Sequence, residues 1–276
     1  MHQVLLTTYA SDPAALAEYC LEDSRLVADI LMEERLIGLY LKKSMLTGLS
    51  LERSTGSIAA FDSLYIRALL KKGMGAPAIG VDRATTGSAP GGLVLEPIPG
   101  LYKNILVFDF KSLYPSIIRS FHIDPLALIE GLKEENPIEG YDGGRFSRDK
   151  FILPELIENL WAARDQAKAQ KNAVLSQTIK IIMNSFYGVL GTTGCRFFDS
   201  RLVSSITKRG HEIIIQSKEY IEEEGYQVIY GDTDSVFVLL GNVAEQEVEK
   251  IGNGLAANLN RWWQEKLESE HGITSY

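Results

Sequence analysis

The sequence has little cysteine, no long apolar run and no surplus of basic residues. Its two cysteines, Cys20 and Cys195, lie far apart and lack metal-ligand spacing, which favours free thiols in a reducing compartment. No apolar run approaches the roughly 18 residues of a membrane helix, and the N-terminus lacks the basic and apolar regions of a signal peptide. We therefore expect a cytoplasmic protein with no membrane partner.

The net charge of −8 is unevenly distributed along the chain. From His211 onward there are 13 acidic and 4 basic residues, a net of −9, whereas the first 210 residues have 23 acidic and 24 basic residues, a net of +1. A chain of this balance would not hold a phosphate backbone by bulk charge. If it acts on nucleic acid, it needs metal ions or a basic segment elsewhere.

Hydrophobic periodicity and turn signals predict an α+β fold. Helices are expected at 14–40, 54–72, 152–170, 174–190, 201–224 and 244–269. A buried strand is expected at 105–108, a β-hairpin at 226–240 and a polar connector at 132–148. Residues 73–100, which are rich in Gly, Pro and Ser, are expected to form a long loop or a set of short strands. From residue 105 onward, this order predicts an antiparallel sheet that is backed by helices and interrupted by a helical hairpin.

Three acidic residues form a candidate metal site. Asp232 and Asp234 lie two apart at the predicted hairpin tip, where alternate residues of an extended chain would face the same way. Such a pair also occurs in solvated Asx turns, and a calcium loop would need further oxygen ligands. Asp109 ends a predicted strand of its own. If that strand neighbours the hairpin, three carboxylates converge, and two Mg²⁺ ions about 4 Å apart would balance their charge.

Cationic residues mark both helices of the predicted hairpin. Lys180, Asn184 and Tyr187 share one helix face, and Arg164 and Lys168 are spaced i, i+4 on the preceding helix. The latter pair could equally be a solvated helix face. Because Arg164 and Lys180 lie equally far from the turn, they should be level with each other and, with Lys168, suit a triphosphate. No Gly-x-x-x-x-Gly-Lys sequence occurs, so a P-loop is excluded.

Three segments resemble the polymerase motifs of family B DNA polymerases, in the family's order. Residues 109–116 read DFKSLYPS, residues 180–188 read KIIMNSFYG and residues 230–235 read YGDTDS. The surrounding chain is most similar to bacterial members of the family, and the resemblance covers nearly the whole chain. It implies a palm of antiparallel sheet backed by helices, with a helical-hairpin fingers insertion.

The resemblance also implies a role for each matching residue. Two Mg²⁺ ions would be held by Asp109, Asp234 and the Phe110 carbonyl, with Asp232 as a third catalytic carboxylate. The nucleotide would contact Ser112, Leu113, Tyr114, Arg164, Lys168, Lys180 and Asn184, and the nascent base pair would contact Tyr187 and Gly188. Tyr114 would lie under the incoming sugar and exclude a 2′-hydroxyl, although it could instead be a packed aromatic beside Pro115.

The same resemblance divides the chain into parts. We expect the end of a 3′–5′ exonuclease domain at 1–35, the palm at 36–150 and 192–276, and the fingers at 151–191. The thumb, the N-terminal domain and most of the exonuclease domain are expected to be absent. Tyr19 and Asp23 resemble an exonuclease motif, but no Asp-x-Glu occurs, so proofreading is not expected. Gly91-Gly92 lies where the family has a template-binding glycine pair, without the usual preceding tyrosine, and its role stays open.

The implied function is template-directed transfer of a nucleotide from a dNTP to a primer 3′-hydroxyl, in DNA replication or repair. The implied partners are primer–template DNA, dNTP and, in a longer enzyme, a sliding clamp; the implied location is the bacterial cytoplasm near the nucleoid. A non-catalytic polymerase-like scaffold and another two-metal enzyme, such as a nucleotide cyclase, remain alternatives. Because the C-terminal part is acidic, we expect the chain alone to fold but to polymerise weakly.

Overall fold

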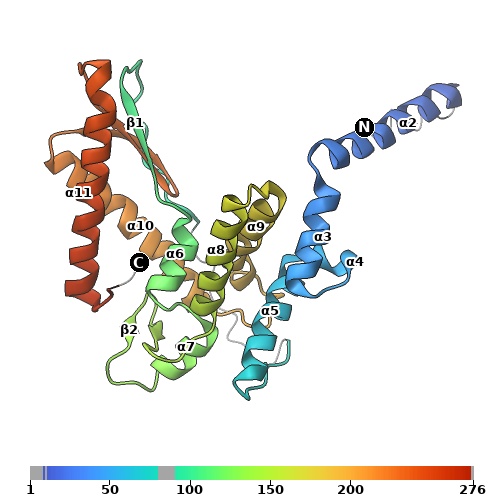
Figure 1. The fold of residues 1–276 in the computed structure, drawn as a ribbon, viewed down its shortest axis with the longest axis horizontal. Coiled ribbons are helices and arrows are strands. Elements are labelled where there is room, and N and C mark those ends of the chain that lie inside the picture. The colour runs from blue at the N-terminus through green and yellow to red at the C-terminus, as the bar shows by residue number, and fades with distance from the viewer. Residues whose placement is uncertain (1–8, 10, 80–90, 275–276) are drawn as a thin grey trace.

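The computed structural model describes residue 9, residues 11–79 and residues 91–274. Figure 1 shows the sheet with α10 and α11 at one end, the α8–α9 hairpin in the middle and α2 to α5 at the other end. The helices are α2 (Pro13–Glu33), α3 (Leu36–Thr47), α4 (Leu51–Ser54), α5 (Ser57–Lys71), α6 (Leu113–Ser120), α7 (Pro125–Gly131), α8 (Leu153–Ala169), α9 (Ala173–Leu190), α10 (Ser200–Glu223) and α11 (Glu245–His271). The strands are β1 (Ile105–Asp109), β2 (Ile138–Glu139), β3 (Arg145–Phe146), β4 (Gln227–Asp232) and β5 (Ser235–Leu239).

The expected α+β class is confirmed, with many helices around small antiparallel sheets. Both cysteines are free thiols, Cys20 exposed and Cys195 buried. None of the helices in the described ranges is long and apolar enough to cross a membrane. The short strands β2 and β3 pair within the predicted connector.

The single helix predicted at 14–40 is wrong, because the chain turns at Arg35 between α2 and α3. Arg35 has φ 53°, in the left-handed region, where a right-handed helix cannot continue. Nor does the apolar periodicity of this segment mark a core face, since α2 has no buried residue. The helix predicted at 54–72 forms as α5, which starts at Ser57, after Gly56, and ends before Gly73, whose φ of 72° is typical of a helix terminus.

The main sheet has the order β1-β5-β4, and both pairings are antiparallel. Its core face presents Val236 and Val238, which are fully buried, and its other face is open. The strand predicted at 105–108 forms as β1, but the prediction that it is buried is wrong: Val107 lies on the open face and is 55% exposed. Apolar content alone predicted burial, but β1 is an edge strand with only one face covered.

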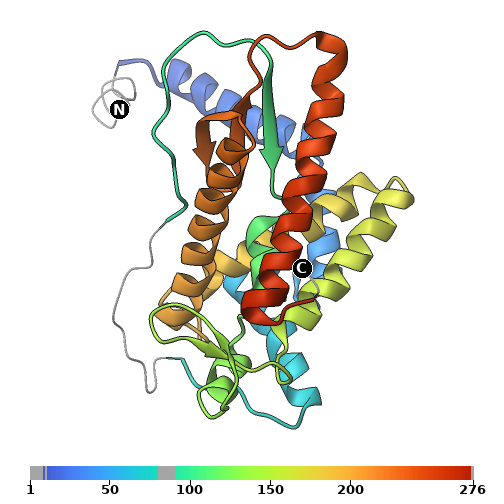
Figure 2. The same ribbon diagram turned by 90° about the vertical axis from the view of Figure 1, so that its left-hand side faces the viewer.

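Part of the segment at 73–100, predicted as a long loop or a set of short strands, extends this sheet along the free edge of β4 (Figure 2). Leu95 N–H donates to the Gly231 carbonyl at 2.8 Å, and Ile98 N–H donates to the Ile229 carbonyl at 2.9 Å. Val94 forms a further antiparallel bridge with Asp232. Residues 93–98 therefore support the strand that ends in Asp232.

The helical hairpin forms as predicted, with the turn at Lys171 and Asn172. Lys171 has φ 56°, and the Asn172 side chain caps α9 by accepting from Leu175 N–H at 3.1 Å. The buried face of α9 packs on α8, α3 and α5; Phe186, for example, meets Phe61 edge-on at 5.4 Å between ring centroids. The helices within 36–71, which were expected to belong to the palm, thus contact the α8–α9 hairpin, which was expected to be the fingers. The division of the chain into palm and fingers stays a prediction.

Asp124 is a fully buried carboxylate where α5, α7 and α8 meet. It accepts hydrogen bonds from the Tyr65 hydroxyl at 2.7 Å, Ala127 N–H at 2.8 Å and Leu153 N–H at 2.8 Å. Burial raises the pKa of Asp124 to about 6, and the hydrogen bonds from these donors oppose that rise. One side chain therefore caps α7 and ties the base of α8 to α5.

We expect Asp124→Asn to lower the free energy of unfolding by about 1–3 kcal/mol, because an amide nitrogen would face a buried donor and leave it unsatisfied. Denaturant unfolding followed by circular dichroism measures this loss. Asp149→Asn, an exposed acid in the loop that leads to α8, should change stability by no more than about 0.5 kcal/mol. Equal effects of the two substitutions would show that Asp124 does not join these helices.

Candidate active site

The tip of the β4–β5 hairpin lies beside the end of β1. Asp109 and Asp232 are both paired with Ser235, one on each side of β5, so the three side chains face the open side of the sheet. Phe110 N–H donates to the Asp234 carbonyl at 2.8 Å. The strand pairing therefore brings the first and third motifs together, although they are more than 100 residues apart in the sequence.

The tip itself is a tight turn, not the extended chain that the sequence reasoning assumed. Thr233 has φ 52°, and Asp234 N–H approaches the Asp232 carbonyl at 2.6 Å. Strand alternation stops at such a turn, so it cannot decide which way Asp234 points. A segment distant in the sequence holds this turn, since Thr233 N–H donates to the Leu93 carbonyl at 2.8 Å.

The carboxylates at the tip repel one another. Burial raises the pKa of Asp234, and the negative charges of Asp109 and, to a smaller extent, Asp232 add to this rise. Ser235 Oγ donates to Asp109 at 3.4 Å, a long hydrogen bond. A cation placed between Asp109 and Asp234 would relieve this repulsion, so the pair fits a metal ion. Within the described ranges, however, no three His, Cys, Asp or Glu side chains cluster closely enough to hold a metal by themselves.

The turn between β1 and α6 places the N-terminus of α6 near these carboxylates. Ser112 adopts a left-handed conformation, φ 51°, and α6 begins at the next residue, Leu113. The first N–H groups of a helix have no intrahelical acceptor and carry partial positive charge. Ser112 has no side-chain capping bond, so these donors remain available to an anionic ligand.

A cleft of about 150 Å³ is lined by residues from all three motifs. It is lined by Ser112, Leu113, Tyr114, Pro115, Asn184, Thr233 and Asp234. Tyr114 is half-buried there, and its ring lies 4.6 Å from that of Tyr187 on α9. Burial, followed by the proximity of Tyr187 and Asp234, raises the pKa of Tyr114 to about 12, so the phenol stays neutral. Most of these residues were predicted from the sequence to bind metal or nucleotide, but Thr233 and Pro115, which form walls of the cleft, were not.

The predicted cations lie on the hairpin outside this cleft. Lys180 is exposed one helical turn before Asn184 on α9, and Gly188 is exposed one turn after it. Lys168 lines an open depression near the turn of the helical hairpin. Its Nζ lies 4.0 Å from Oδ1 of Asp165, which is one turn earlier on the same helix. Arg164 is half-buried, and its Nε has no hydrogen-bond partner among the described residues. The expected three-cation surface therefore stays a prediction.

The two exonuclease-like residues lie on α2, away from the cleft. Tyr19 is 53% exposed and Asp23 is exposed one turn later. Figure 1 shows α2 projecting from the rest of the chain. The structure places no described acidic cluster around them, so their assignment stays a prediction.

Comparison with known proteins then decides the family. The model of DNA polymerase family B matches residues 57–273. This chain belongs to that family. It is 49% identical to DNA polymerase II of Escherichia coli (strain K12) over 266 residues, which cover 95% of this chain and 34% of that protein. The predicted resemblance to bacterial family B polymerases is confirmed.

More distant relatives of this family B chain are polymerases too. A DNA polymerase of Thermococcus gorgonarius is 32% identical over 197 residues, covering 67% of this chain and 26% of that protein. The DNA polymerase alpha catalytic subunit of Drosophila melanogaster is 31% identical over 191 residues, covering 63% of this chain and 12% of that protein. The chain thus spans about a third of the E. coli relative's length and less of the other two.

The role of Gly91-Gly92, left open by the sequence, is partly explained by its contacts in this family B chain. The Gly91 carbonyl lies 2.7 Å from His211 Nε2 on α10. A Cβ atom at Gly92 would lie 2.5 Å from Thr233 Oγ1, closer than side chains tolerate. Gly92 therefore allows residues 93–98 to approach the hairpin tip.

We expect Gly92→Ala to displace Thr233 and to lower the free energy of unfolding by about 1–3 kcal/mol, the usual cost of overpacking. Gly91→Ala is the matched control, because a Cβ atom there would have no neighbour within 4 Å. Denaturant unfolding gives the energies, and backbone amide NMR shifts of residues 232–235 report movement of the tip. Equal stability and unchanged shifts in Gly92→Ala would disprove the close approach.

Proposed function

We propose that the chain carries the metal- and nucleotide-binding site of a DNA-directed DNA polymerase. The observation that carries this proposal is the 150 Å³ cleft, which joins backbone donors at Leu113, the Tyr114 ring, Asn184 and the Asp234 carboxylate in one place. The chain's membership of family B supports the same reaction, which is template-directed addition of a dNTP to a primer 3′-hydroxyl. The sheet would be the palm and the α8–α9 hairpin the fingers.

The metal ligands in this proposal are Asp109, Asp234 and the Phe110 carbonyl, with Asp232 close by. Burial and, after it, the negative charges of Asp109 and Asp232 raise the pKa of Asp234, and this unfavourable placement of carboxylates supports a site for divalent cations. Two Mg²⁺ ions bound there would activate the primer hydroxyl and stabilise the charge on the pyrophosphate leaving group. Phosphate oxygens of the nucleotide would complete the coordination, because the protein supplies few ligands of its own.

The chain's own residues would bind and orient the nucleotide. Backbone N–H groups at Ser112 and Leu113 would donate to the phosphates, where the partial positive charge of the α6 N-terminus favours an anion. Tyr114 would support the sugar. Beyond the cleft, Lys180 and Arg164 would bind the triphosphate tail. The buried Arg164 Nε has no hydrogen-bond partner in the described part of the chain, which supports a missing acceptor there.

The base pair would lie against the exposed face of α9. Asn184 lines the cleft, and Tyr187 and Gly188 follow one turn later on the same helix. Primer–template DNA would then occupy the open face of the sheet, where Asp109 and Asp232 end their strands. Since duplex binding relies on many phosphate contacts and the residues from His211 onward carry −9, this chain alone would hold DNA weakly.

Asp234→Asn should abolish the Mg²⁺ dependence of nucleotide binding, because it removes one of the two facing carboxylates. Titration of fluorescent mant-dATP in MgCl₂ and in EDTA measures this dependence. Wild-type affinity should fall at least tenfold in EDTA, whereas the variant should be weak in both. Asp29→Asn, an exposed acid on α2, should behave like wild type. If the wild-type chain binds neither magnesium nor nucleotide, a non-catalytic scaffold is the correct interpretation.

Tyr114→Ala should reduce discrimination against ribonucleotides by about tenfold, within the range that one pocket contact gives. The ring forms a wall of the cleft, so its removal opens space for a 2′-hydroxyl. Competition of ATP and dATP with mant-dATP gives the affinity ratio. Tyr114→Phe keeps the ring and should keep the ratio. An unchanged ratio in Tyr114→Ala would assign the side chain to packing beside Pro115.

A further inference from the structure

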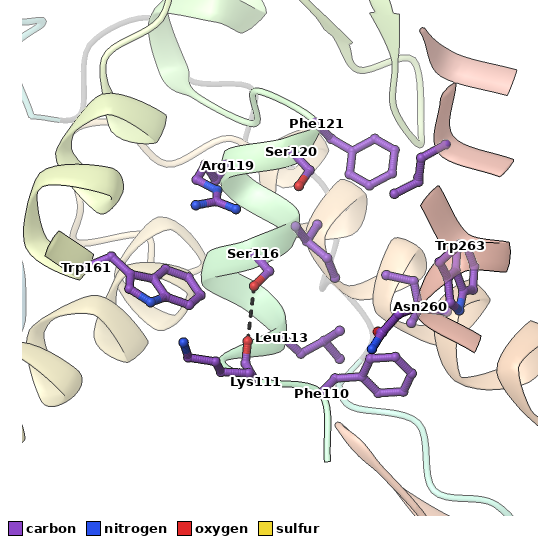
Figure 3. Close-up of a pocket in the computed structure, with 13 residues that line it drawn as sticks. Phe110, Lys111, Leu113, Ser116, Arg119, Ser120, Phe121, Trp161, Asn260 and Trp263 are labelled. Atoms are coloured by element: carbon purple, nitrogen blue, oxygen red, sulfur yellow. Dashed lines mark hydrogen bonds between the residues drawn. The ribbon is translucent and has the colours of Figure 1, made fainter. Parts of the chain in front are cut away.

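A larger hollow adjoins the candidate active site and shares Leu113 with it. Its volume is about 380 Å³, within the range of about 300–1,000 Å³ typical of small-molecule sites. Figure 3 shows α6 as its floor, with Trp161 of α8 on one side and Asn260 and Trp263 of α11 on the other. None of the proposed roles in nucleotide addition uses this hollow.

One end of the hollow is apolar. Ile117, Phe121 and Trp263 present side chains that are at most 6% exposed, and Phe110 lies beside them. The indole N–H of Trp263 donates to Ser217 Oγ at 2.8 Å, so the only polar atom of the Trp263 side chain already has a hydrogen-bond partner. This end therefore offers aromatic and aliphatic surface, which suits a flat apolar group.

The other end is cationic. Lys111 Nζ lies 5.1 Å from the centroid of the Trp161 ring, and the Arg119 guanidinium carbon lies 5.3 Å from it. In Figure 3 the indole lies between the two cations. Neither forms an ion pair with a described carboxylate, and none of the 13 lining residues is acidic, although the chain carries −8. Two like charges held around one ring are stabilised by an anion.

We infer that this hollow is a binding site for a small amphipathic anion. Its flat apolar body would lie against Phe110, Ile117 and Trp263, and a single carboxylate, sulfonate or phosphate would bind Lys111 and Arg119. The inference does not depend on the proposed polymerase reaction. It does have a consequence for it: an occupant would contact Phe110 and Leu113, the same turn whose backbone faces the metal and nucleotide site.

The test uses anilinonaphthalene sulfonate, a fluorescent dye with a flat aromatic body and one sulfonate. We expect saturable binding with one site per chain, measured by fluorescence and by calorimetry. Arg119→Gln should weaken binding about tenfold, which corresponds to about 1.4 kcal/mol. Asn260→Phe, at the wall formed by α11, should weaken it by a similar factor by covering the apolar end. Arg261→Gln, an exposed residue of the same helix outside the lining, should have no effect.

The neutral analogue N-phenylnaphthylamine separates charge from apolar contact. It should bind about tenfold more weakly than the sulfonate and should be insensitive to Arg119→Gln, while Asn260→Phe still weakens it. Circular dichroism confirms that each variant is folded. Absence of saturable binding overturns the inference. So does binding that none of the variants changes, because the dye would then lie elsewhere, for example on the exposed apolar residues of α2.

Discussion

The pairing of β1 with β5 is the constraint on which the candidate active site depends. A shift of one residue would turn Asp109 to the helix-covered face and move an apolar side chain to the open face. Burial opposes that shift, since Val236 and Val238 on β5 are enclosed while Ser235 is not. The bond from Phe110 N–H to the Asp234 carbonyl continues the pairing past the strand. The register thereby sets both the carboxylate pair and the turn that leads into α6.

The other wall of the cleft depends on a different set of contacts. The α8–α9 helical hairpin is anchored at its base by Asp124, whose three hydrogen bonds join α5, α7 and α8. Between the two walls, the rings of Tyr114 and Tyr187 meet at 4.6 Å. The cleft thus lies between two separately held elements with an aromatic contact across it. The same helix, α6, forms one wall of the cleft and the floor of the amphipathic hollow.

Local patterns predicted the type of most elements, but single residues and neighbouring elements decided their limits and burial. Asn172 could be recognised as the start of α9 because its cap is a local interaction. Arg35 could not be recognised as the break between two helices, because an arginine side chain does not favour a left-handed backbone. Val107 was expected to be buried, yet which faces of an edge strand are covered depends on helices distant in the sequence.

For the site, the sequence by itself determined which residues carry the motifs, their order and hence the family. Tertiary structure alone decided where they lie: Asp234 beside Asp109, Thr233 as a wall of the cleft, and Lys168 outside it. It also decided between the long loop and the short strands expected at 73–100: residues 93–98 pair with β4 and support the hairpin tip. The physical reason is the difference in sequence range between the two kinds of interaction. Helix caps, turns and apolar periodicity act over a few neighbouring residues, whereas these placements arise from hydrogen bonds and packing between segments far apart in the chain.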